Sequence, residues 1–257
     1  MNYVNVLAAS AALAFGISTA QATAINYQAS GSLTDGSPLF GIADFTTGAG
    51  FIDVTLINGL TASTFQNQGQ TLSDITFVLS NPPGKQGTLS VVSGQLGDID
   101  PSTGVVTYLS TGSPVRFLGQ GPHAPNGSGT FTVSGSTITM EALGGGAPSE
   151  LIVPLVSDGG KFTSNLSNVS NFNPYTIGPA MFELDFAGVT AQTTITSAIF
   201  SFGTNPDKSL PGSTCVDCGP GTLSNGVPEP ASMLVLGAGL VGLGAARRWG
   251  RQQASTI

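Results

Sequence analysis

Residues 194–202 read Thr194-Ile195-Thr196-Ser197-Ala198-Ile199-Phe200-Ser201-Phe202, and apolar residues alternate with hydroxylated ones through most of this run. Successive side chains of a β-strand point to opposite faces, so this alternation predicts a strand with one apolar and one polar face. Gly129-Thr130-Phe131-Thr132-Val133 repeats the pattern. These two stretches indicate a protein built from half-buried strands.

Similar short runs, separated by Gly, Asn, Asp and Pro, continue outward in both directions, and no central stretch keeps a helical period for three turns. Such a series predicts an all-β protein with an antiparallel β-sandwich, jelly-roll-like, as its single domain at residues 25–204. The expected strands are Ile25–Ser32, Leu39–Phe45, Phe51–Ile57, Ile75–Leu79, Thr88–Val92, Val105–Leu109, Thr130–Val133, Thr137–Ala142, Ile152–Val156, Phe182–Phe186 and Thr193–Phe202.

The composition is that of an exported β-protein rather than a cytosolic helical enzyme. Only 8% of the 257 residues are charged, 36 are glycine, and the formal net charge is −7. A surface this poor in Lys and Arg cannot neutralise phosphates, so nucleic acid is excluded as a partner. We expect the acidic balance to serve solubility.

The N-terminus has the layout of a secretory signal peptide. An apolar run from Val6 to Ile17 precedes small residues that end in Ala20-Gln21-Ala22-Thr23-Ala24. This run is too short to cross a bilayer comfortably, and two overlapping A-x-A sites follow it. Residues 1–24 are therefore predicted to be a signal peptide that is removed after Ala22 or after Ala24.

The C-terminus has three parts in a fixed order. Pro228-Glu229-Pro230 is followed by sixteen uncharged, mostly apolar residues at 231–246, and then by Arg247, Arg248 and Arg251. The apolar run predicts a single transmembrane helix, and the arginines should hold its end in the cytoplasm, which places Pro-Glu-Pro outside. Proline restricts both its own φ and the residue before it, so Glu229 is presented on a stiff, extended segment.

These three parts, at residues 227–251, closely resemble the PEP-CTERM sorting signal. The resemblance implies that an exosortase recognises Pro228, Glu229 and Pro230 and processes the chain. It also implies a Gram-negative host that makes exopolysaccharide, with an inner-membrane intermediate followed by the outer envelope or the extracellular matrix as the final location. It implies nothing about the activity of the domain in front of it.

Between the predicted domain and this signal, residues 205–226 are rich in Pro, Gly and Ser and predict a stalk. The stalk contains the two cysteines of the chain, Cys215 and Cys218. Thiols of an exported protein are usually oxidised, and we expect a local disulfide. An intermolecular crosslink, reduced or modified thiols, and a metal or redox site are the alternatives.

Candidate catalytic and metal-binding residues are few. His123 is the only histidine and lies in a Gly/Pro-rich stretch, so a histidine-dependent hydrolase is not expected. Asp98 and Asp100 could offer oxygen ligands to Ca²⁺, but an Asp-Pro turn capped by its own side chains is the expected structure. Glu183 and Asp185 share one strand face, which we interpret as a solvated face rather than a glycosidase pair.

Carbohydrate binding is the main alternative function, because β-sandwiches often stack sugars on exposed aromatic rings. Only Tyr27, Tyr108 and Tyr175 are available for this in the predicted domain, since the single tryptophan is Trp249. We therefore expect a non-enzymatic surface or matrix protein of the envelope, with no catalytic residues, cofactor or metal, associated with exopolysaccharide or biofilm. A carbohydrate-binding module is the alternative, and a secreted hydrolase is a distant third.

Overall fold

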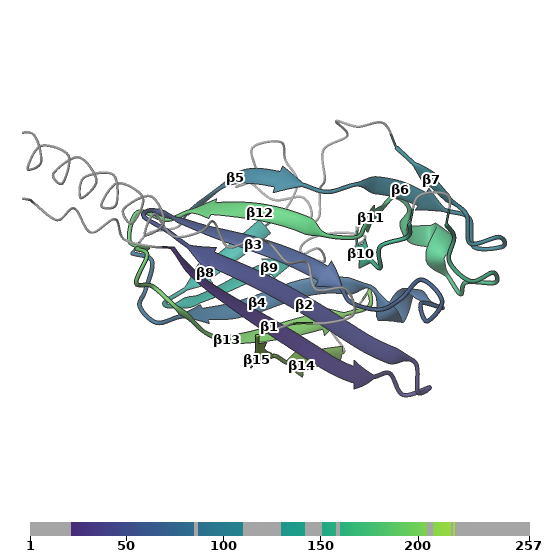
Figure 1. The fold of residues 1–257 in the computed structure, drawn as a ribbon, viewed down its shortest axis with the longest axis horizontal. Helices are drawn as coiled ribbons and strands as arrows, with labels where there is room; N and C mark the ends of the chain where they lie inside the picture. The colour runs from purple at the N-terminus through teal and green to yellow at the C-terminus, as the bar shows by residue number, and fades with distance from the viewer. Residues whose placement is uncertain are drawn as a thin grey trace, which may run out of the picture.

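The protein consists of two packed β-sheets, seen in a computed structural model that describes residues 22–84, 87–109, 130–141, 151–157, 160–204, 208–216 and 218. Figure 1 shows the sheets stacked, with β1, β2 and β3 lying over β4 and β9. The six-stranded sheet has the order β15 (Ser213–Cys215), β1 (Thr23–Ser32), β2 (Pro38–Thr47), β3 (Phe51–Asn58), β12 (Ala180–Asp185) and β5 (Thr88–Ser93).

The second sheet has nine strands, and two of them branch from its main path. The main path is β14 (Lys208–Pro211), β13 (Ile195–Phe202), β4 (Leu72–Leu79), β10 (Ile152–Val153), β11 (Tyr175–Ile177), β6 (Leu96–Ile99) and β7 (Val106–Tyr108). Strand β9 (Thr137–Glu141) also pairs with β4 and carries β8 (Thr130–Ser134). Short 3-10 helices lie at Gln68–Gln70 and Val169–Phe172.

Alternation within the strands builds the core between the sheets. In β3, Ile52, Val54 and Leu56 are fully buried, whereas the intervening Asp53 and Thr55 remain partly exposed on the outer face. Aromatic rings join the two sheets, since Phe45 of β2 lies 4.9 Å from Phe77 of β4 between ring centroids. Each such ring contributes about 1.5 to 3 kcal/mol by leaving water.

Three stretches of chain pass from one sheet into the other and join the sheets along their sides. Figure 1 shows β5 running on into β6, and β12 lies next to β11 in the chain, turned at Gly178, whose φ is +86°. On the other side, β14 pairs with β13 of one sheet, and β15 pairs with β1 of the other. Strands that bend at a corner and change sheets are a known way to close a sandwich.

The prediction of an antiparallel β-sandwich is confirmed, with one parallel pair between β10 and β11. All eleven expected strands are present, although the one expected at Ile152–Val156 stops at Val153. Pro154 follows directly and has no N–H to continue the ladder. The sequence missed β6, β11, β14 and β15, which are short strands within the three stretches that change sheets.

The predicted domain end at residue 204 and the stalk at 205–226 need correction. Residues 208–211 and 213–215 are strands of the sandwich. The composition misled because these strands bury few side chains and are held mainly by backbone hydrogen bonds to β13 and β1. Leu210 alone packs against the core.

Candidate functional site

The consecutive strands β14 and β15 connect the sandwich to the C-terminal segment, and the chain bends between them at Gly212. The Gly212 amide donates a 2.8 Å hydrogen bond to the Ala198 carbonyl of β13. A Cβ at this position would lie 2.9 Å from Cε2 of Phe200, closer than side chains tolerate. Glycine therefore lets the chain cross closely over β13 and turn toward β1.

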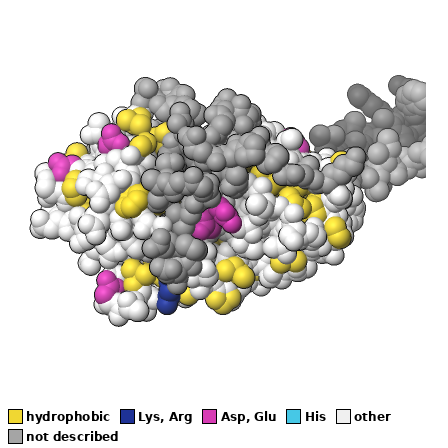
Figure 2. Space-filling model, turned by 180° about the vertical axis from the view of Figure 1, so that it is seen from behind, with side chains coloured by type: hydrophobic (Ala, Val, Ile, Leu, Met, Phe, Trp, Pro, Cys, Tyr) yellow, Lys and Arg dark blue, Asp and Glu magenta, His cyan; other side chains and the backbone are white. Residues whose placement is uncertain are grey.

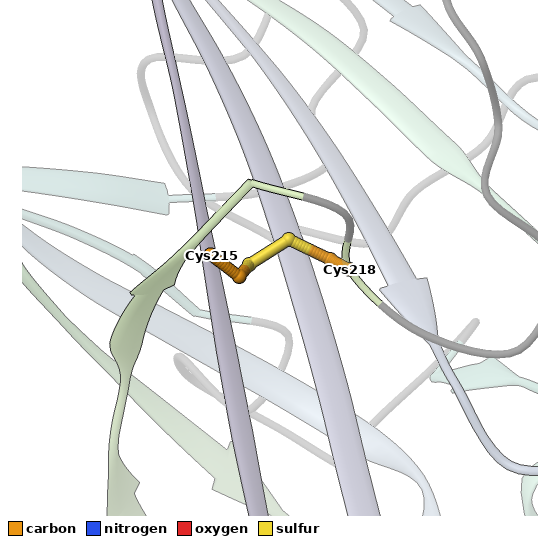
Figure 3. The surroundings of a disulfide bond; sticks show 2 residues. All are labelled: Cys215 and Cys218. Carbon is orange, nitrogen blue, oxygen red and sulfur yellow. A yellow bond between two sulfur atoms is a disulfide. The ribbon is translucent and has the colours of Figure 1, made fainter.

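Strand β15 ends in a disulfide bond between Cys215 and Cys218 (Figure 3). Cys215 is the Cα partner of Asn26 on β1, and the two cysteine Cα atoms are 5.6 Å apart. Between them, Val216 is 92% exposed. The two sulfur atoms are bonded to each other in this structure, as in the local disulfide that the sequence led us to expect. The bond closes a small surface ring where the chain leaves the sheet.

The predicted sorting residues follow this ring but lie outside the described residues. This applies to Pro228, Glu229 and Pro230, to the helix expected at 231–246, and to Arg247, Arg248 and Arg251. The signal peptide is likewise outside, apart from its last residues from Ala22 onward. Among the residues that the structure describes, no helix has the length and apolar character needed to cross a membrane.

Asp100 forms the turn expected from the Asp-Pro sequence. Its Oδ1 accepts hydrogen bonds from the Ser102 amide at 2.8 Å, the Ser102 hydroxyl at 2.6 Å and the Thr103 amide at 3.3 Å. These bonds, led by those from Ser102, lower the pKa of the Asp100 carboxyl. Asp98 instead lies in β6 opposite Thr107. The interpretation as a self-capped turn is confirmed, and the described ranges contain no group of three or more His, Cys, Asp or Glu able to hold a metal.

Glu183 and Asp185 lie on the outer face of β12, alternating with buried Phe182 and Leu184. Glu183 accepts a 2.8 Å hydrogen bond from the Ser90 hydroxyl of β5. Across the ladder it lies opposite Asp53 of β3, whose pKa is raised by burial and, secondarily, by the charge of Glu183. The pair is therefore part of an acidic sheet surface, in agreement with the expected solvated face.

The three tyrosines have different environments. The Tyr27 hydroxyl donates to the Ile195 carbonyl at 3.0 Å, and the Tyr175 hydroxyl donates to the Val169 carbonyl at 2.7 Å. Both rings are in the core, and burial raises the pKa of each hydroxyl. Tyr108 is 38% exposed, and its hydroxyl donates to the Val156 carbonyl. Burial therefore removes Tyr27 and Tyr175 from the three candidates for sugar stacking, and Tyr108 is the one of the three that is partly exposed. His123 lies outside the described residues.

The family comparison addresses the C-terminal segment directly. Residues 226–248 match the family model of the PEP-CTERM protein-sorting motif. This chain carries a PEP-CTERM motif. The match spans Pro228-Glu229-Pro230, the apolar run, Arg247 and Arg248, and it ends before Arg251.

A PEP-CTERM motif implies an exported protein that an exosortase handles at the membrane of a Gram-negative bacterium. Comparison with curated proteins and with solved structures finds no match. The PEP-CTERM match thus concerns the export and sorting of the protein and does not extend to the sandwich.

Proposed function

We propose that this protein is a non-enzymatic component of the bacterial surface or extracellular matrix, released to that location when an exosortase processes its PEP-CTERM segment. The observation that supports this proposal is the position of the motif, which begins at Gly226, shortly after the Cys215–Cys218 ring ends the last strand. The protein would then reach the exosortase as a folded sandwich followed by a short C-terminal segment that carries the sorting motif.

The physical steps follow from the sequence of the tail. The signal peptide directs export, and the helix at 231–246 then holds the chain in the inner membrane while Arg247 and Arg248 keep its end in the cytoplasm. Pro228-Glu229-Pro230 is then a stiff segment at the outer face, where the exosortase recognises it. After processing, the sandwich leaves for the outer envelope or the matrix.

The surface of the sandwich suits a hydrated, carbohydrate-rich surrounding. On the face that Figure 2 shows, the part of the surface that the structure describes is mostly uncharged polar side chains and backbone, with a few acidic side chains and several small hydrophobic groups. Hydroxyl groups also interact between neighbouring strands of the nine-stranded sheet, as between Thr76 and Thr139 at 3.1 Å and between Ser201 and Ser209 at 3.0 Å. Association with exopolysaccharide in a biofilm is the role we assign to this face.

Glu229→Ala and Glu229→Gln test the proposal in the full-length protein. Both should leave export intact but strand unprocessed chain in the inner membrane, because the exosortase loses the carboxylate that it reads. Replacing all three arginines by Glu should have the same effect through loss of the cytoplasmic stop. Ser224→Ala, outside the matched segment, is the control and should be processed normally.

Fractionation combined with C-terminal mass analysis gives the readout. If the Glu229→Ala chain is trimmed and reaches the outer envelope at the wild-type level, the exosortase proposal is wrong. An ordinary single-helix anchor would then replace it.

A carbohydrate-binding module is the second candidate, and the exposed ring of Tyr108 favours it. On a polysaccharide array, saturable binding by the purified mature protein should survive Tyr108→Phe, which keeps the ring, and disappear in Tyr108→Ala. Binding that is equal in both variants would exclude a Tyr108 stacking site.

A further inference from the structure

The start of β1 distinguishes between the two overlapping signal-peptidase sites that the sequence leaves open. Strand β1 begins at Thr23, the residue after the first site, and its ladder with β2 starts with the pair Thr23–Thr47. Ala22 precedes the strand and is exposed. Cleavage after Ala22 keeps the whole strand, whereas cleavage after Ala24 removes its first two residues.

Thr23 contributes side-chain bonds as well as backbone pairing. Its hydroxyl donates a 2.6 Å hydrogen bond to the carbonyl of Ala191, a residue that is only 4% exposed. Thr23 also pairs across the ladder with Thr47, which is fully buried and donates its hydroxyl to the Thr193 carbonyl at 2.6 Å, while the Thr23 carbonyl lies 3.5 Å from the same hydroxyl. Thr23 therefore ties β1 and β2 to the 190–193 turn that leads into β13.

Loss of Thr23 would expose this corner of the sandwich. The Ala191 carbonyl would lose its hydroxyl donor, and Thr47 would lose the residue that pairs with it at the end of β2. A buried polar group without its partner is costly, and shortening a strand at its first ladder pair frays the sheet. Ala24 makes no comparable contribution, since its side chain is exposed on the outer face.

We infer that signal peptidase cleaves between Ala22 and Thr23, so that Thr23 is the first residue of the mature protein and part of its fold. The inference rests on the export step of the proposed function. Ala20 and Ala22 supply the small residues that this cleavage needs. The second A-x-A site, Ala22-Thr23-Ala24, is then not the one used.

N-terminal sequencing and intact mass of the exported protein test the inference in the full-length chain. Wild type and Ala24→Leu, which blocks only the second site, should both begin at Thr23. Ala20→Leu, which blocks only the first site, should shift the start to Ile25. The protein that begins at Ile25 should then unfold several degrees below the protein that begins at Thr23.

The outcomes separate the inference from the export proposal. A wild-type start at Ile25 overturns the inference and leaves export standing, and so does an Ile25 form with an unchanged unfolding temperature, because Thr23 would then have no structural role. Intact Met1 on the surface protein overturns the export step itself.

Discussion

Cys215 lies opposite Asn26 across the ladder between β15 and β1, so the strand that leads to the sorting motif ends beside the beginning of the first strand. The first residues of β1 and the end of β15 are therefore close to each other at one edge of the six-stranded sheet.

The first prediction concerns the disulfide. Cys215→Ser/Cys218→Ser should lower the free energy of unfolding by about 1 to 2 kcal/mol, less than for a long loop because the closed ring is small. It should also speed proteolysis after β14, since β15 buries little else. Denaturant unfolding and limited proteolysis measure these effects. Reduction should reproduce both changes in wild type and have no effect on the variant; a reduction-sensitive variant would contradict the assignment.

The second concerns the bend at Gly212. Gly212→Val should destabilise the mature protein by about 1 to 3 kcal/mol, because the added atoms meet Phe200 and the Ala198 carbonyl. Ser213→Val is the matched control at the next position, where the side chain is exposed. It should change stability by no more than about 0.5 kcal/mol. Equal effects of the two substitutions would mean that close passage over β13 does not restrict residue 212.

The third separates a core tyrosine from a surface one. Tyr175→Phe should cost about 1 to 2 kcal/mol, because the buried Val169 carbonyl loses its hydroxyl donor. Tyr108→Phe removes a hydroxyl near solvent, so water can replace it and the change should be smaller. Urea unfolding of both variants tests the order. A larger loss for Tyr108→Phe would place Tyr108, rather than Tyr175, at the structural position.

The fourth concerns pH. Burial and the facing Glu183 raise the pKa of Asp53 above its ordinary value of 3.8, so the folded protein holds the proton more tightly than the unfolded chain does. The contribution of Asp53 to stability therefore falls as pH rises from that ordinary value through the raised one. Asp53→Asn should be more stable than wild type at pH 7, and the difference should shrink on acidification.

Asp35→Asn provides a control of opposite sign. Hydrogen bonds from Ser37 lower the pKa of Asp35, so its contribution to stability is present at neutral pH and is lost as pH falls through the lowered value. Thermal unfolding between pH 3 and pH 7 gives both curves. A difference between Asp53→Asn and wild type that does not vary with pH would refute the electrostatic argument.

The sequence predicted the sandwich wherever a strand is long enough to show alternation. Residues 194–202 and 51–57 are examples, because their buried and exposed positions follow a strict period of two over most of their length. It failed where a strand is divided between two sheets. Leu96–Ile99 and Ser213–Cys215 are too short for a pattern, and each pairs with a strand far away in the chain, β11 and β1 respectively, which no local composition reveals.

Candidate sites were predictable where the interacting residues are close in the sequence, and not where they are distant. The turn at Asp100 was predictable because its partners lie two and three residues away. The burial of Tyr175 was not, because it depends on the pairing of β11 with β6, about eighty residues earlier in the chain, and on the packing around the ring. The sorting motif was predictable because it is a linear sequence motif, defined by the order and chemistry of its residues and not by the fold.

The continuous path from Lys208 to Cys215 has a mechanical consequence. Any tension on the C-terminal tail, whether from the membrane before processing or from an attachment afterwards, reaches the sandwich through this path. Because β15 is hydrogen-bonded to β1 and β14 to β13, a pull from the tail must break the pairing with one sheet and then with the other before it reaches β13. The C-terminal end of the described domain is thus joined to both sheets in succession, and a force on the tail has to undo two separate strand pairings.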